Sequence, residues 1–183
     1  MSKRSSYTLF IVSLIALGIF SRFIPHPPNA TAIGAVALFG GFALKNFRTS
    51  ILVLFLSLFI SDLALNNLVY AAYNDGFVWL TSGATFIYAG FFISIVLGYF
   101  LKKRYSLSGI AAGSVFSVLA FFLITNAAVW ASSVMYPKTI HGLMTAYAAG
   151  IPFALNQLLA TVLYATVLFG AHALYTRKSP ALA

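Results

Sequence analysis

Residues 51–62, ILVLFLSLFISD, form an apolar run that ends in an aspartate. Extended outward to 49–73, this run predicts a helix that, at about 1.5 Å per residue, can cross a hydrocarbon core of about 30 Å. The carboxylate of Asp62 would then lie inside a bilayer. Because an acid at that depth costs at least about 2.5 kcal/mol, we expect Asp62 to face the protein interior and to be paired, with Arg22 as one available partner.

The composition also indicates an exterior that faces lipid. Of the 183 residues, 61% are hydrophobic and 7% are charged, and the mean hydropathy is +0.96. A soluble domain of this size would need a more polar surface. The sequence contains no cysteine, which excludes disulfides, thiolate metal sites and cysteine nucleophiles.

Further apolar segments lie on both sides of this run. We predict a single all-α integral membrane domain over 1–183, with six transmembrane helices at about 7–23, 30–44, 49–73, 77–101, 107–134 and 151–175. The second segment is short for a bilayer. We therefore expect it to begin below the outer surface, after the prolines of 25–28, with Asn29 or Thr31 as its N-cap.

Basic residues divide unequally between the two ends of these segments. One end carries Lys3, Arg4, Lys45, Arg48, Lys102, Lys103, Arg104, Arg177 and Lys178, and the other carries only Arg22 and Lys138. By the positive-inside rule, both termini should be cytoplasmic. The net charge of +9 is then explained by short loops that meet anionic lipid, and we expect no nucleic-acid partner.

Polar side chains recur on one face of two predicted helices. Asp62, Asn66 and Tyr70 are spaced at i, i+4 and i+8, and Asn126 and Trp130 at i and i+4. Such faces are typical of a pocket wall that hydrogen-bonds a solute in apolar surroundings. The alternative for Asp62 is a purely structural pair that locks the bundle, and for each amide it is a hydrogen bond to a neighbouring helix.

The last predicted helix adds the amides of Asn156 and Gln157 about two turns from its start. Three helices with polar groups at similar depth favour one shared cavity over three separate helix contacts. We further expect 135–150 to form an outer loop that closes over this cavity as a lid.

Enzymatic chemistry has little to work with in this sequence. Asp62 and Asp75 are its only acids, and no nucleophile, P-loop or metalloprotease motif is present. His26 and His141 on outer loops would make a poor metal site without thiolates or more acids. We therefore predict a protein that is not an enzyme and that has no cofactor or metal.

The stretch 22–41, RFIPHPPNATAIGAVALFGG, resembles the hallmark of an uncharacterised bacterial membrane family of putative transport proteins. That family is similar to the substrate-binding S-components of energy-coupling-factor (ECF) vitamin transporters. Weaker matches are Ser61-Asp62-Leu63, Thr125-Asn126 with Trp130, Tyr136-Pro137, Gly142-Leu143, and Ala149-Gly150-Ile151-Pro152-Phe153 with Asn156. The resemblance implies an S-component-like bundle in the bacterial inner membrane that captures a scarce small molecule from outside.

S-components usually carry an A-x-x-x-A motif on helix one for docking onto an energising module. Ser13, Ala16 and Gly18 do not match it, so both an ECF-type partner and a solitary transporter stay open.

From these observations we predict a membrane transport protein that imports a small metabolite, such as a vitamin or a modified-base precursor. The alternative is a non-transporting membrane interaction or assembly subunit. A cavity of about 300 Å³ or more under the proline-rich loop would favour transport. The predicted outward-facing pocket is lined by Arg22, His26, Asn29, Asp62, Asn66, Tyr70, Asn126, Trp130 and Asn156.

Overall fold

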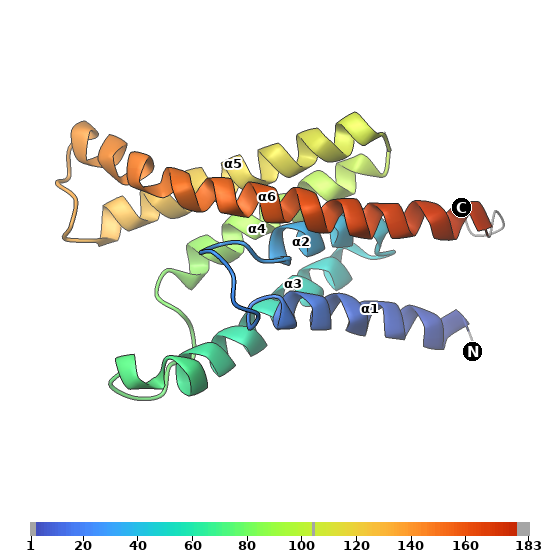
Figure 1. The fold of residues 1–183 in the computed structure, drawn as a ribbon, viewed down its shortest axis with the longest axis horizontal. Coiled ribbons are helices and arrows are strands. Elements are labelled where there is room, and N and C mark those ends of the chain that lie inside the picture. Colours follow the sequence, from blue (N-terminus) through green and yellow to red (C-terminus); the bar gives the residue numbers. More distant parts are fainter. Residues whose placement is uncertain (1–2, 104, 179–183) are drawn as a thin grey trace.

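The computed structural model describes residues 3–103 and 105–178, and this part of the chain is helical without strands (Figure 1). The elements in chain order are α1 (Lys3–Phe20), α2 (Ile33–Ala43), α3 (Phe47–Ala64), a π-helical turn η1 (Leu65–Val69), a 3-10 turn η2 (Ala71–Tyr73), α4 (Ala84–Leu101), α5 (Leu107–Ser132) and α6 (Ile140–Lys178).

Four helical stretches are long and apolar enough to cross a membrane. They are Phe47–Val69, Ala84–Leu101, Leu107–Ser132 and Ile140–Thr176. The remaining apolar helices are shorter, over Ser5–Phe20 and Ile33–Ala43. The chain is therefore an all-helical protein of the multi-pass membrane type, and the number of six spans stays a prediction.

Helix α2 lies at the centre of the bundle. Figure 1 shows it between α1 and α3 on one side and α4, α5 and α6 on the other, and it packs against all five. Every residue from Ile33 to Gly41 is buried. This segment consists only of apolar and small residues, so helices can surround it without burying a polar side chain.

Helices α2 and α4 approach each other closely at glycines. A Cβ added to Gly98 would lie 1.9 Å from the backbone oxygen of Leu38, and one added to Gly41 would lie 2.1 Å from that of Ile95. Side chains larger than hydrogen are excluded at both positions, because the obstructing atoms belong to the backbone. Gly98 and Gly41 thus serve packing inside the bundle, where small residues let two helix backbones approach.

The start of α2 differs from the prediction. Its N-cap is Ala32, which has no side chain to cap the helix, so the expected caps Asn29 and Thr31 are wrong. Asn29 instead adopts a left-handed backbone with φ 66°. The buried N–H of Ala32 has no partner within α2 and donates to the Oγ of Ser21 at 3.1 Å, so a side chain just after α1 satisfies it.

The predicted lid is also wrong. Only 133–139 connects α5 to α6, and 140–150 forms the first turns of α6. Gly142 and Gly150 suggested a loop, but Gly142 packs against the backbone of Pro137, and α6 runs without a break through both glycines and Pro152. Neighbouring helices make an internal proline tolerable in a membrane protein.

Two other predicted boundaries change. Helix α4 begins at Ala84 rather than at residue 77, because Gly83 precedes it with φ 75°. The predicted helix 49–73 starts earlier, at Phe47, where the Asn46 side chain accepts a hydrogen bond from the N–H of Arg48. Its regular α-helical part ends at Ala64, and η1 and η2 follow.

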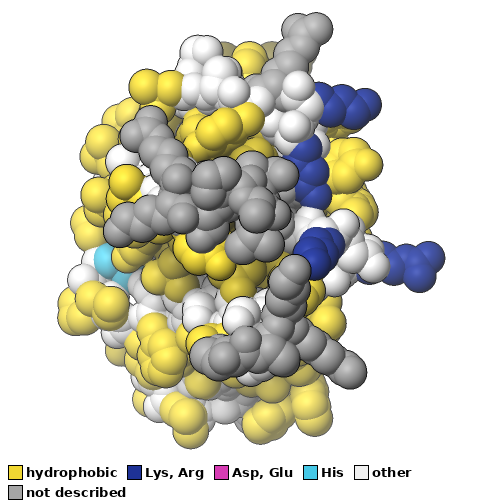
Figure 2. All heavy atoms as spheres, turned by 90° about the vertical axis from the view of Figure 1, so that its right-hand side faces the viewer, with side chains coloured by type: hydrophobic (Ala, Val, Ile, Leu, Met, Phe, Trp, Pro, Cys, Tyr) yellow, Lys and Arg dark blue, Asp and Glu magenta, His cyan; other side chains and the backbone are white. Residues whose placement is uncertain are grey.

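Charge gathers at one end of the bundle. Both chain ends lie at the same end in Figure 1, and Figure 2 shows Lys and Arg side chains on that end. The connections α2–α3 and α4–α5 lie there and supply Lys45, Lys102 and Lys103, and the first turn of α3 adds Arg48. Lys138 lies in the α5–α6 connection at the opposite end. This arrangement agrees with the predicted asymmetry, whereas orientation in a membrane stays a prediction.

The glycine contact between α2 and α4 can be tested with a matched pair of substitutions. Gly98→Ala should lower the free energy of unfolding by about 1–3 kcal/mol, because the new methyl group forces the two backbones apart. Gly170→Ala on α6 meets no atom within 4 Å and should be neutral or slightly stabilising. Thermal unfolding in detergent measures both variants. Equal stability of the two would contradict this packing.

Candidate functional site

An ion pair between the partly buried Arg22 and the buried Asp62 joins the end of α1 to α3. Nη2 of Arg22 lies 2.7 Å from Oδ1 of Asp62, whose side chain is 3% exposed. Nη1 of the same guanidinium donates to Oγ of Ser61 at 2.5 Å. Asp62 is thus turned inward and paired with Arg22, as expected of an acid on an apolar helix.

The segment 21–32, here called the proline connection, is fastened at three places. Oγ of Ser21 accepts from the N–H of Ala32, which joins the two ends of the connection, and Arg22 fixes its start to α3. In the middle, Nδ2 of Asn156 on α6 donates to the oxygen of Pro28 at 3.2 Å. The connection therefore spans from α3 to α6.

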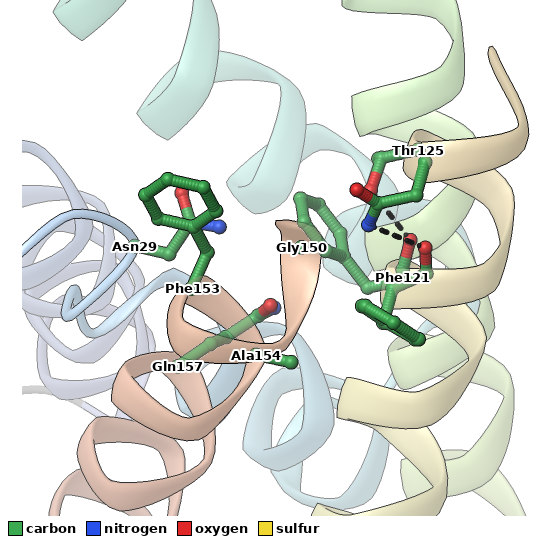
Figure 3. A pocket seen from close by; sticks show the side chains of 9 residues that line it. Asn29, Phe121, Thr125, Gly150, Phe153, Ala154 and Gln157 are labelled. Carbon is green, nitrogen blue, oxygen red and sulfur yellow. Dashed lines mark hydrogen bonds between the residues drawn. The ribbon is translucent and has the colours of Figure 1, made fainter. Parts of the chain in front are cut away.

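A small hollow lies where the proline connection meets α5 and α6 (Figure 3). Its free space is about 160 Å³ when the part open to solvent is included. The room inside suffices for about one water molecule. It is smaller than the about 300 Å³ expected of a metabolite pocket. The lining residues are Asn29, Phe121, Phe122, Thr125, Asn126, Gly150, Phe153, Ala154 and Gln157.

The polar groups from α5 bond to their own helix. Nδ2 of Asn126 donates to the oxygen of Phe122, and Oγ1 of Thr125 donates to that of Phe121, both at 2.8 Å. The Asn126 amide lies against α6, where a Cβ on Gly150 would be 2.3 Å from its Oδ1. A glycine at position 150 is what leaves space for this amide.

Gln157 is the most buried polar side chain of the hollow, at 4% exposed. Figure 3 shows it reaching from α6 toward α5. The sequence prediction selected its neighbour Asn156 as a lining residue. The structure assigns the lining position to Gln157, while Asn156 holds the proline connection. The detectable signal was the presence of a second amide in the apolar run.

The hollow brings together only part of the predicted pocket. Asn29 and Asn126 line it, and Asn156 lies at its border through Pro28. The pair Arg22–Asp62 does not line it and serves to fix the proline connection.

The other predicted residues lie in loops and turns. Nδ1 of His26 lies 2.8 Å from the oxygen of Pro27. Asn66 donates to Oγ1 of Thr81 at 3.0 Å. Tyr70, the residue that follows η1, is 50% exposed. None of these three residues lines the hollow.

Trp130 also lies outside the hollow. Its Nε1 donates to the oxygen of Pro137 at 2.9 Å, and Lys138 lies over its ring and donates to its backbone oxygen. It therefore fixes the α5–α6 connection.

Metal ligands do not converge in the part of the chain that is described, since no group of three or more His, Cys, Asp or Glu side chains occurs there. The charges of Arg22 and Asp62, which could in principle act on a bound molecule, neutralise each other. What the hollow offers is hydrogen bonding by amides and a hydroxyl beside aromatic rings.

Fold and site together define a multi-pass helical membrane protein with a buried ion pair and a small, uncharged, amide-lined hollow. The chain belongs to DUF6580, a family of unknown function, whose model matches residues 2–182. No curated protein and no solved structure matches the chain.

The contribution of the ion pair can be measured by removing one partner. Arg22→Ala leaves the carboxylate of Asp62 buried without its counter-charge and should lower the free energy of unfolding by about 3–5 kcal/mol. Replacing both charges, with Arg22→Met and Asp62→Leu, should restore most of that loss, because no unpaired charge remains. Unfolding in detergent is the readout.

Arg48→Ala is the matched control, since Arg48 is exposed at the basic end and its backbone N–H, not its side chain, bonds to Asn46. If Arg22→Ala were as stable as Arg48→Ala, the ion pair would have no part in holding α1 to α3.

Proposed function

We propose that this protein is a membrane transport protein that binds a small metabolite at the amide-lined hollow and carries it inward. The observation that carries the proposal is the buried amide of Gln157, which faces a space shared by α5, α6 and the proline connection. A solute site needs such converging polar groups in apolar surroundings. The resemblance of 22–41 to putative transport proteins, similar to ECF S-components, points the same way.

Entry of a metabolite requires the hollow to open. Its room for about one water molecule corresponds to a closed state. The contact most easily broken is the single hydrogen bond from Asn156 to Pro28, because one neutral hydrogen bond contributes only about 1 kcal/mol. Residues 23–31 would then lift from α6 while Arg22 stays fixed to Asp62. Vitamins and modified-base precursors are the proposed solutes.

In this proposal the protein crosses the bacterial inner membrane six times, with both termini in the cytoplasm. Both an ECF-type energising module and a solitary mode of transport are compatible with it. The end of the bundle that carries Lys45 and Arg48 would face inward, and the hollow would face outward.

The absence of native cysteines allows a direct topology test. Single-cysteine variants Asp75→Cys and Arg48→Cys place one exposed thiol at each end of α3 and its following turns. In intact spheroplasts, a membrane-impermeant maleimide should label Asp75→Cys and should label Arg48→Cys only after permeabilisation. The reverse pattern would overturn the orientation and make the hollow face the cytoplasm.

The second candidate function is that of a non-transporting interaction or assembly subunit. The small size of the hollow favours it, because a subunit of this kind needs no solute cavity. In that case the polar groups under the proline connection would only hold the bundle together.

Native mass spectrometry of the detergent-purified protein separates the two functions. Transport predicts a small molecule of defined mass that is carried through purification by the wild type and lost from Gly150→Ala, which pushes the Asn126 amide into the hollow. Gly170→Ala on the same helix, where the new methyl group meets nothing, should keep the molecule.

An empty wild-type protein, whose melting temperature is unchanged by a panel of vitamins and nucleobases, would support the subunit function, because a ligand of the native state raises stability.

A further inference from the structure

The Gln157 amide is buried without a partner. Its side chain is 4% exposed, and no group among residues 3–103 and 105–178 forms a hydrogen bond with it. By contrast, the structural amide of Asn67 donates to the oxygens of Leu63 and Val78 and accepts from the N–H of Val78. The amide atoms of Gln157 reach the free space of the hollow, so their donor and acceptor are available to a binding partner.

The remaining polar groups of the hollow, on Asn29, Thr125 and Asn126, leave both donors and acceptors free. The hydroxyl proton of Thr125 is used by the oxygen of Phe121, and one N–H of Asn126 is used by that of Phe122. Lone pairs on both side-chain oxygens are left over. A partner that presents both an N–H and a C=O matches these free donors and acceptors better than one that has only acceptors.

Charge is missing from the lining. All nine lining residues are uncharged. The charged residue that lies closest to any of them in sequence is Arg22, before Asn29, and Asp62 neutralises it. An ionised solute would have no counter-charge in these apolar surroundings and would lose its hydration. The rings of Phe121, Phe122 and Phe153 provide flat apolar surfaces instead.

On the basis of the proposed function, we infer that the solute is an uncharged, planar compound with an amide or lactam edge. That edge carries an N–H next to a C=O and pairs with the carboxamide of Gln157 through two hydrogen bonds. A heteroaromatic ring behind the edge packs against the phenylalanines. Gln157 is thus the residue that selects a neutral amide over the corresponding acid.

The probes for this inference differ in one group each. Nicotinamide carries a primary amide on an aromatic ring, nicotinate replaces it with a carboxylate, and N,N-dimethylnicotinamide removes both N–H groups. Uracil supplies a lactam edge. Each is added at millimolar concentration to the purified full-length protein, and the melting temperature is recorded. Nicotinamide and uracil should raise it, whereas nicotinate and the dimethyl amide should leave it unchanged.

The variant Gln157→Met keeps the volume of the side chain and removes its polar atoms. Without any probe it should melt at a temperature equal to or a few degrees above that of the wild type, because the unpaired amide is gone. It should nevertheless lose the response to nicotinamide and uracil. Thr166→Val, on the exposed side of α6, is the control that keeps this response.

Three results would overturn the inference: no stabilisation by nicotinamide or uracil, equal stabilisation of Gln157→Met, or stabilisation by nicotinate. The failure of the proposed function looks different. If native mass spectrometry finds a carboxylate or phosphate compound bound, the transport proposal holds and the amide inference fails. If nothing co-purifies and no compound of either panel stabilises the protein, both fail.

Discussion

The pair Arg22–Asp62 is the constraint on which the rest of the arrangement depends. Either charge alone among these apolar helices would be unfavourable, whereas together, at 2.7 Å, they are neutral. The pair fixes the end of α1 to α3 and therefore fixes where the proline connection begins. Oγ of Ser21 then accepts a hydrogen bond from the N–H of Ala32, so the chain comes back to the end of α1 just before α2 begins. This short return places α2 in the middle of the bundle.

The central position of α2 in turn determines where a solute site can exist. Its glycines and alanines allow α4 to approach until backbone meets backbone, which leaves no space along most of its length. At its first turn, Gly34 touches Thr161 of α6, and Gln157 lies one turn before Thr161 on the same face. Since α2 begins only at Ile33, no helix fills the space beside Gln157, and the hollow occupies it.

The pairing of Asp62 could be predicted from the local sequence pattern, whereas the residues that line the hollow depend on the rotational phase of the helices. The depth of Asp62 in its apolar run was enough to predict an inward-facing, paired acid. The start of α6 was not predictable, because Gly142 and Gly150 are individually loop signals that tertiary packing overrides. The path of α6 sets the phase of the helix, and a phase difference of one residue decides that Gln157 rather than Asn156 lines the hollow. Trp130 shares a face with Asn126, yet its indole bonds to a loop oxygen that no pattern reveals.

The contrast between two amides supports the proposal that the hollow is a binding site rather than a packing defect. Asn67 is a structural amide: its N–H donates to the oxygen of Val78 and its side-chain oxygen accepts from the N–H of Val78, which fixes the loop after η1. The Gln157 side chain is as buried as that of a core residue, yet its amide fixes no loop or neighbouring helix by a hydrogen bond. In a membrane protein, burying such a group without a partner is a cost that an apolar side chain of the same volume would avoid. The hollow has room for about one water molecule, and a solute with a matching edge would displace that water and take over both hydrogen bonds of the amide. Closure of the proline connection over the solute would then exclude water from the same hydrogen bonds and strengthen them.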